Sequence, residues 1–190
     1  MELWDAYDSE WNKTGGTLVR GEPVPEGLYH MVCGILVEHA DGTFLLMKRH
    51  PQKETWPNVY EASGGGSVLM GETACEAARR ELREETGIEA GELIPLYEEW
   101  RKQSLYRGYL CRTDWPKDLI TLQEGETVDW RWATAEEIAE MMLVQPPACI
   151  IQRGVLVYLG MMEMEGQKNL RVFLRKGETM DGEKEQKDHR

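Results

Sequence analysis

No stretch of this 190-residue chain approaches the run of about 18 uninterrupted apolar residues that a membrane-spanning helix needs. The longest candidates are Met31 to Val37 and Val155 to Met162, and a glycine interrupts each of them. The first ten residues, MELWDAYDSE, are acidic and contain no apolar export core. The sequence therefore predicts a cytoplasmic protein with no membrane partner.

Closely spaced cysteines are also absent. Cys33, Cys75, Cys111 and Cys149 are separated by 42, 36 and 38 residues, which gives neither a CxxC pair nor the spacing of a metal knuckle. We expect four reduced thiols that act as small buried side chains.

Positive charge is scarce. Lys and Arg total 22 against 34 Asp and Glu, which gives a net charge of -12. Phosphate backbones are bound by clustered Lys and Arg, so duplex nucleic acid is excluded as the main partner. If the ligand is an anionic small molecule, another group must supply positive charge.

The composition, 41% hydrophobic and 29% charged, is that of an ordinary globular protein. The length fits one domain, which we place at residues 1–176. Within it, residues 1–28 are expected to form a hairpin extension and a Pro/Gly connector. Residues 177–190 are polar and have no periodicity, which predicts a disordered tail.

Strand patterns recur along the chain. Leu3 to Arg20 predicts a hairpin that turns at Asn12 to Gly16. Two antiparallel strands are expected at 29–38 and 43–49, joined by an Asp-Gly turn signal, and the first is apolar enough to be central. Shorter or later strands are expected at 59–62, 93–100, 104–112, 128–133 and 170–174.

Three helices are expected, and two of them have explicit start signals. The T-x-x-E pattern at Thr73 is a capping box, and Gly87 predicts the end of that helix. The same pattern at Thr134 predicts a helix to about residue 143. Pro146 and Pro147 predict the start of a third, apolar helix that runs towards residue 162.

The helix after Thr73 gathers three carboxylates on one arc. At about 100° per residue, Glu85 lies about 40° and Glu84 about 300° from Glu81. The adjoining arc carries small and apolar side chains, so the carboxylates lie at the boundary of the buried face. A charge-rich solvent face paired with Arg80 and Arg83 is the alternative.

Stability alone does not favour these carboxylates. Glu84 and Glu85 lie in the last turn, where the helix dipole disfavours each anion by about 0.3–1 kcal/mol. Glu81 and Glu85 are also a like-charge pair four residues apart. Local rules are broken in this way at functional sites, and clustered oxygen ligands suit a hard cation such as Mg²⁺ or Mn²⁺.

Residues 66–88 read GSVLMGETACEAARRELREETGI, and this segment resembles the Nudix hydrolase box. The box is G, five residues, E, seven residues and R-E-U-x-E-E-x-G-U, where U is aliphatic. All nine specified positions match: Gly66, Glu72, Arg80, Glu81, Leu82, Glu84, Glu85, Gly87 and Ile88.

The resemblance implies an α/β fold, an α/β/α sandwich with a mixed sheet, here preceded by the hairpin extension. It implies hydrolysis of a diphosphate linkage in a nucleoside diphosphate joined to a further group, with Mg²⁺ or Mn²⁺ as cofactor. The metal ligands would be Glu81, Glu84, Glu85 and the carbonyl of Gly65. Arg80 would orient these glutamates, while Glu72, Gly66 and Gly87 would support them.

The family often adds a further glutamate from a loop beyond the box. The segment QEGE supplies Glu124 and Glu126, and we prefer Glu126 because it immediately precedes the strand TVDWRW. The general base stays open among Glu81, Glu85, Glu124 and Glu126.

Substrate contacts are less strongly indicated. Lys48 and Arg49 end the strand FLLMKR and could reach phosphate. Trp56, and less strongly Trp100, Trp130 and Trp132, could stack on a base, although most of the seven tryptophans are expected in the core. His30 is expected to be structural. The methionines of 141–164 are expected to pack internally, with a homodimer surface as the alternative.

Two other functions compete with hydrolysis. The stretch WPNVYEASGGG, with the N-terminal 30 residues, is similar to the Nudix subgroup that includes type 1 isopentenyl diphosphate isomerase and its hydrolase relatives. Those isomerases carry a Cys and a His in a CGHP-like element where this chain has Gly64 to Val68, so we favour hydrolysis over isomerisation. The second alternative is a non-catalytic, nucleotide-sensing Nudix module, which has no need of the complete carboxylate set.

Overall fold

A computed structural model describes residues 1–177 of the chain. The tail predicted at 177–190 lies outside this part, except for its first residue. No helix within the described residues is both long and apolar enough to cross a lipid bilayer.

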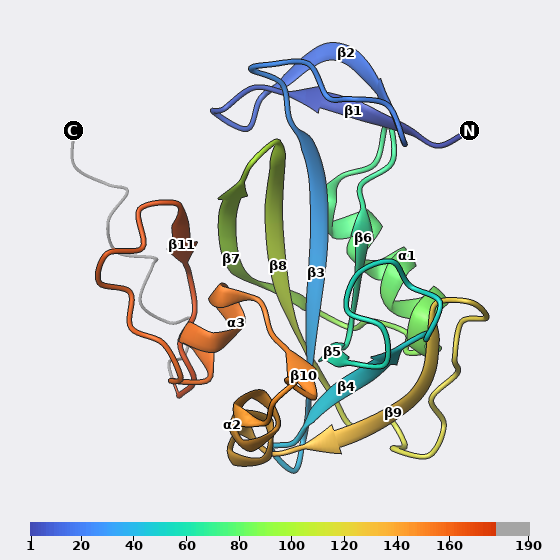
Figure 1. Ribbon diagram of the computed structural model, residues 1–190, viewed down its shortest axis with the longest axis vertical. Helices are drawn as coiled ribbons and strands as arrows, with labels where there is room; N and C mark the ends of the chain where they lie inside the picture. Colours follow the sequence, from blue (N-terminus) through green and yellow to red (C-terminus); the bar gives the residue numbers. More distant parts are fainter. Residues whose placement is uncertain (178–190) are drawn as a thin grey trace.

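A mixed β-sheet forms the centre of the molecule (Figure 1). Strand β3 (His30–His39) pairs in parallel with β8 (Ser104–Thr113) and antiparallel with β4 (Phe44–Arg49). The strand order is β10-β5-β4-β3-β8-β7-β11, with β6 paired to β3 and β9 to β4. The remaining strands are β5 (Tyr60–Ala62), β6 (Gly64–Ser67), β7 (Leu93–Arg101), β9 (Thr127–Ala133), β10 (Cys149–Ile150) and β11 (Leu170–Val172).

Alternation along the strands builds one core on each face of the sheet. Leu45 and Met47 of β4 contribute to the core beneath α1 (Ala74–Thr86), whereas Phe44 and Leu46 contribute to the opposite core. The helices α2 (Ala135–Leu143) and α3 (Arg153–Tyr158) pack in that second core. The α/β/α sandwich with a mixed sheet is therefore confirmed.

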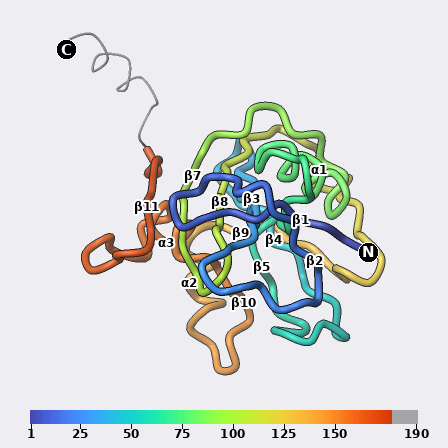
Figure 2. The backbone as a smooth tube through the Cα atoms, turned by 90° about the horizontal axis from the view of Figure 1, so that it is seen from above, coloured from blue at the N-terminus to red at the C-terminus, as the bar shows by residue number. Residues whose placement is uncertain are grey.

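The N-terminal hairpin consists of β1 (Leu3–Tyr7) and β2 (Lys13–Val19), and it crosses one end of the sheet (Figure 2). The hairpin was predicted, but its turn was misplaced: the chain reverses at residues 8–12. There the Asp8 carboxylate accepts backbone hydrogen bonds from Glu10 and Asn12, which stabilises the turn at this earlier position.

Two further strands were not expected from the sequence. The glycine-rich segment from Gly64 to Ser67 pairs with β3 as β6. The continuous helix expected from Pro146 to residue 162 is absent. Instead β10 adds to β5 as a parallel strand, and only the six residues of α3 are helical, because sheet pairing outweighs the local apolar pattern.

Two glycines fix an aromatic side chain beneath the sheet. A Cβ atom at Gly108 or Gly154 would overlap the ring of Tyr97, so only glycine admits the ring there. Tyr97 is thereby held between β8 and α3, and it also lines the cavity described next.

Candidate active site

A cavity of about 530 Å³ opens at the carboxylate face of α1. Strands β3 to β8 line it together with the loop that enters β9. The N-terminal hairpin reaches it through Glu2 and Arg20, whose side chains form an ion pair of 2.8 Å. The three carboxylates that share an arc of α1, Glu81, Glu84 and Glu85, all line this cavity, as the helical spacing predicts.

Strand β6 approaches α1 so closely that its glycines leave room only for the glutamates. A Cβ atom at Gly66 would lie 2.5 Å from the carboxyl carbon of Glu81, and one at Gly64 would lie 2.8 Å from Oε2 of Glu85. A Cβ at Gly65 would meet the backbone carbonyl of Cys33 at 2.6 Å. The glycine run therefore provides space for the two carboxylates.

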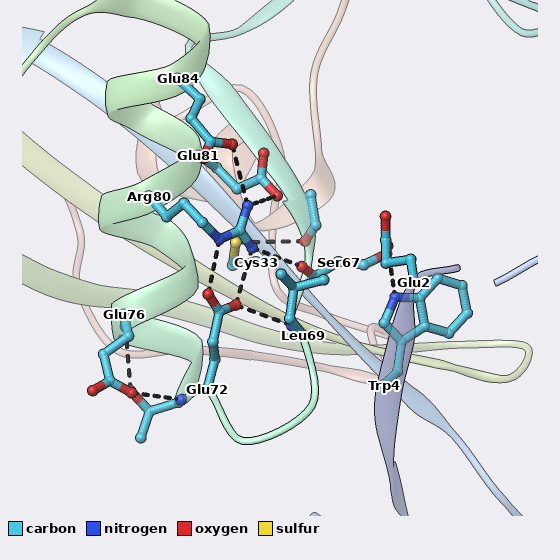
Figure 3. A network of polar contacts seen from close by, with 12 residues as sticks. Glu2, Trp4, Cys33, Ser67, Leu69, Glu72, Glu76, Arg80, Glu81 and Glu84 are labelled. Carbon is cyan, nitrogen blue, oxygen red and sulfur yellow. Dashed lines mark hydrogen bonds and ion pairs between the residues drawn. The ribbon is translucent and has the colours of Figure 1, made fainter. Parts of the chain in front are cut away.

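Arg80 organises the box (Figure 3). Its Nε and Nη2 donate to the Glu72 carboxylate at 2.8 and 3.0 Å, and Nη2 also donates to the Ser67 carbonyl. Its Nη1 donates to Glu81 at 2.8 Å and to Glu84 at 3.4 Å. Glu72 in turn accepts a hydrogen bond from the backbone N–H of Leu69, so α1 is tied to the loop before it.

Burial shifts the protonation of two box glutamates. It raises the pKa of Glu85 to about 8, and repulsion from Glu81 adds to this, while the backbone N–H of Gly65 donates to Glu85 at 3.1 Å and opposes it. Burial also raises the pKa of Glu81, against the hydrogen bond from Arg80. Two carboxylates that resist ionisation side by side are suited to receive a cation.

Within the described residues, no three His, Cys, Asp or Glu side chains converge closely enough to bind a metal ion as they stand. Arg80 engages Glu81 and Glu84, whereas Glu85 faces the backbone of Gly65. The donor set nevertheless fits a hard cation, because it consists of carboxylate oxygens around one cavity. Arg80 contacts Oε1 of Glu81 and Oε2 of Glu84, so the second oxygen of each carboxylate could serve the ion while Arg80 stays in place.

The two candidate loop glutamates differ in their position relative to the cavity. Glu126 lines the cavity and forms an ion pair with Lys53. Glu124 is exposed and does not line the cavity. Of the pair, only Glu126 is placed to act on a ligand there.

The predicted substrate contacts are only partly assembled. Arg49 lines the cavity, where its Nη1 bonds Glu61 at 2.6 Å. Lys48 does not line it; its Nζ lies 5.7 Å from the centre of the Tyr60 ring. Trp56 lies outside this cavity but lines an adjoining hollow.

The other singled-out side chains are structural. The indole N–H groups of Trp130 and Trp132 both donate to the Lys117 carbonyl, and that of Trp100 donates to the Ser9 carbonyl. His30 stacks on Trp4 with ring centroids 4.5 Å apart. The cysteines at 33, 75, 111 and 149 are all unbridged, and the methionines 141, 142, 161, 162 and 164 pack against the second core.

Sequence reasoning gave no role at the cavity to many of its lining residues, of which four bear on the chemistry discussed below. Cys33 lines it, with its Sγ 3.5 Å from the Gly66 carbonyl and its pKa raised by burial to about 12. Arg101, Tyr106 and Gln152 line it as well. Each lies far from the box in sequence. Arg101 and Tyr106 come near it because β7 and β8 pair within the sheet.

Comparison with known proteins agrees with this geometry. The sequence profile of the NUDIX domain matches residues 28–154, which begins where the hairpin extension ends. An uncharacterized Nudix hydrolase of Listeria monocytogenes is 37% identical over 144 residues, which cover 73% of this chain and 83% of the relative. The chain belongs to the Nudix hydrolase family. As such, it is a hydrolase of phosphorus-containing anhydrides.

Two further comparisons show which other Nudix proteins this chain is similar to. A crystal structure from Deinococcus radiodurans aligns with a TM-score of 0.64 at 25% identity, covering 78% of this chain and 92% of the other. An isopentenyl-diphosphate Delta-isomerase of Salmonella typhi is 26% identical over 124 residues, or 62% of this chain and 68% of the relative. Isomerase relatives are thus present, as the sequence resemblance implied.

The shifted pKa of Glu85 predicts how stability depends on pH in the absence of metal. Its pKa is about 8 in the folded Nudix domain against an ordinary value of 4.5, so the folded state binds more protons between these values. This contribution is complete below about pH 4.5, and the free energy of unfolding falls as pH rises towards 8. Glu85→Gln should flatten the decline.

Urea unfolding in a chelator between pH 5 and pH 8 measures this effect. The matched control is Glu89→Gln, at an exposed position beyond the helix end. Equal slopes for the wild type and Glu85→Gln would contradict the assignment.

Proposed function

We propose that this protein hydrolyses the diphosphate linkage of a nucleoside diphosphate joined to a further group, with Mg²⁺ or Mn²⁺ as cofactor. The observation that supports this most is the charge of the cavity lining. It includes six carboxylates, Glu2, Glu61, Glu81, Glu84, Glu85 and Glu126. It includes five cations, Arg20, Arg49, Lys53, Arg80 and Arg101. Each of these cations already lies in an ion pair with a carboxylate, so the charge of a diphosphate would have to be offset by a divalent cation that comes with it.

In this proposal Glu81, Glu84, Glu85 and the Gly65 carbonyl hold the ion. When bound, the ion lowers the pKa of water towards neutrality and screens the diphosphate oxygens. Arg80 positions Glu81 and Glu84, and Glu72 fixes Arg80 in turn.

Hydrolysis also requires a proton acceptor. We assign this role to Glu126, which takes a proton from the water that attacks phosphorus, while the bridging P–O bond breaks and its electrons remain on the departing phosphate oxygen. The ion pair with Lys53 fixes the Glu126 side chain at the cavity.

Glu126→Gln tests this assignment. We expect kcat to fall about 100-fold or more, because a positioned general base contributes about 10²–10⁴-fold. The Kd for Mn²⁺ should change little, since Glu126 is not assigned as a ligand. Glu124→Gln is the matched control at an exposed position two residues away; a loss of rate in that variant instead would move the base to Glu124.

The function itself is tested by a product-resolved screen of diphosphate compounds with Mg²⁺, in which the broken bond is identified. The panel includes nucleotide sugars, dinucleotides, coenzymes and isoprenoid diphosphates. Metal-dependent release of two phosphate-bearing products from a nucleoside diphosphate derivative supports the proposal. Metal-independent binding without turnover across the panel would instead support a sensing module.

Isopentenyl diphosphate separates hydrolysis from isomerisation. The Cys33 thiol lines the cavity, and isomerisation would need a group there that exchanges a proton with carbon. Two observations argue against isomerisation: the box is complete, and the pKa of the Cys33 thiol is raised to about 12. Conversion of isopentenyl diphosphate to its isomer, without release of phosphate or pyrophosphate, would overturn the proposal.

A further inference from the structure

A second hollow of about 390 Å³ adjoins the carboxylate cavity. Apolar and aromatic side chains form most of its lining, including Trp56, Met142 and Ile150. Arg101 and Gln152 line both spaces, so the two hollows are neighbours that meet at these side chains. A substrate whose phosphates lie near α1 and which reaches past these two side chains would place its other end in the second hollow.

Arg101 differs from the other cations of the cavity because its carboxylate partner also pairs with a second arginine. Its Nη2 lies 2.8 Å from Oε2 of Glu99, which is fully buried. The other oxygen of Glu99 already accepts from Nε of Arg153 at 2.5 Å. One carboxylate thus serves two guanidinium groups, and this cluster keeps a net charge of +1.

The other arginine of this cluster is more fully engaged. Arg153 also donates to the side chains of Gln167 and Asn169, at 2.9 and 3.2 Å. Arg101 contacts Glu99 and lies over the Tyr106 ring, 5.1 Å from its centre. Its side chain retains 39% exposure. The surplus charge is therefore available to an anion at the junction of the two spaces.

Gln152 provides a polar group of a different kind at the same junction. Its Oε1 is buried, and it has no hydrogen-bond partner within the described residues. An unpaired buried amide oxygen is costly, so a turn of this side chain into the hollow to meet a donor on a ligand is favoured. An isoprenoid chain has no such donor, whereas a nucleobase edge presents donors and acceptors side by side, which complements an amide.

Trp56 contributes an aromatic side chain to the lining of the second hollow. Its side chain is 53% exposed, unlike those of the core tryptophans. Its backbone has φ of 52°, in the left-handed region that a bulky residue seldom adopts. Local strain of this kind is found where a side chain is held for binding.

We infer that the second hollow is a nucleobase subsite, in which Trp56 stacks on the base, the Gln152 amide pairs with its edge, and Arg101 binds the nucleoside 5′-phosphate. The inference deepens the proposed diphosphate hydrolysis and rests on it for the orientation of the substrate. It assigns recognition of the nucleoside to residues outside the Nudix box.

Calorimetric binding of the four common nucleoside 5′-monophosphates, with ribose 5-phosphate as a ligand that lacks the base, tests this subsite without metal or turnover. We expect at least one nucleotide to bind at least about 10-fold more tightly than ribose 5-phosphate. Trp56→Ala should weaken that nucleotide by roughly 5- to 150-fold, the range found for loss of base stacking. Gln152→Leu should weaken it by roughly 5-fold or more, and neither variant should change the binding of ribose 5-phosphate.

Arg101→Gln should weaken both ligands, because each carries the same phosphate. Matched controls are Phe173→Ala, at another exposed aromatic residue, and Arg83→Gln, which removes the same charge from an exposed position on α1. Gln152 makes no side-chain capping bond to α3, so its replacement removes no helix cap. Equal binding of nucleotides and ribose 5-phosphate, or unchanged binding in the Trp56 and Gln152 variants, would overturn the subsite.

Kinetics separate this inference from the proposed function. With a nucleoside diphosphate substrate and Mg²⁺, Trp56→Ala and Gln152→Leu should raise KM about 10-fold and leave kcat within about 3-fold. Hydrolysis that is unaffected by both variants would overturn the subsite and leave the hydrolase. Selective nucleotide binding without any hydrolysis would support the subsite and count against the hydrolase.

Discussion

Replacing Glu85 by glutamine is expected to lower the rate of diphosphate hydrolysis by about 100- to 1,000-fold or more, with the fold intact. The amide removes the negative charge that would bind the cation and keeps the size of the side chain. Its carbonyl oxygen can still accept from the backbone N–H of Gly65, as Oε2 of Glu85 does at 3.1 Å. Because burial already disfavours the charged form of Glu85, the neutral side chain should not destabilise the protein.

Steady-state rates at saturating Mg²⁺, together with thermal unfolding, measure this effect. Glu84→Gln should also reduce the rate by orders of magnitude, although the Glu84 side chain is 40% exposed and its contact with Arg80 is long, at 3.4 Å. Glu89→Gln is the matched control outside the cavity. An unchanged rate in Glu85→Gln would remove its assigned role.

Gly66→Ala is expected to reduce the rate by about 100-fold, because the added methyl group displaces the Glu81 carboxylate. Gly66 does not have a positive φ, so alanine meets no backbone strain there. The obstacle is the side chain of Glu81, whose carboxyl carbon would lie 2.5 Å from the new Cβ. Gly91→Ala is the control, because a Cβ at that position meets nothing within 4 Å.

A double variant distinguishes a local effect from unfolding. If Gly66→Ala acts by moving Glu81, then adding Glu81→Ala should recover any lost stability without restoring the rate. A Gly66→Ala enzyme with the wild-type rate would contradict the close approach of β6 to α1. Equal losses of stability in the single and double variants would place the strain elsewhere.

The features predicted correctly from sequence are those set by local chemistry. The capping box at Thr73 and the left-handed Gly87 delimit α1, because both act within one helical turn. The same holds for the second capping box, at Thr134. The common arc of Glu81, Glu84 and Glu85 follows from helical geometry alone, and the three do line one cavity.

The features that sequence reasoning missed depend on pairing between distant segments. Strand β6 contains three consecutive glycines, which have no strand propensity, and it forms because β3 offers a partner. Strand β10 likewise exists because β5 is free on that side. The spread of Glu81 and Glu84 towards Arg80 follows from side-chain ion pairs, which helical angles do not describe.

Specificity was the least predictable part. Arg101 has no sequence signal, since its surplus charge depends on the contact of Glu99 with Arg153, 54 residues away in the chain. Gln152 was assigned to a helix interior, but it precedes α3 and lines both hollows. Trp56 was identified from the sequence as a candidate to stack on a base. In the structure it lines the second hollow, so stacking is expected there.

Calorimetric titration with Mg²⁺ and with Mn²⁺ tests the central claim most directly. The wild-type chain should take up the cation with an affinity that rises with pH, because the ligands must lose their protons. A variant with Glu81, Glu84 and Glu85 all changed to glutamine should show no uptake at this site. Equal uptake by the two proteins, or none by the wild type, would contradict the account.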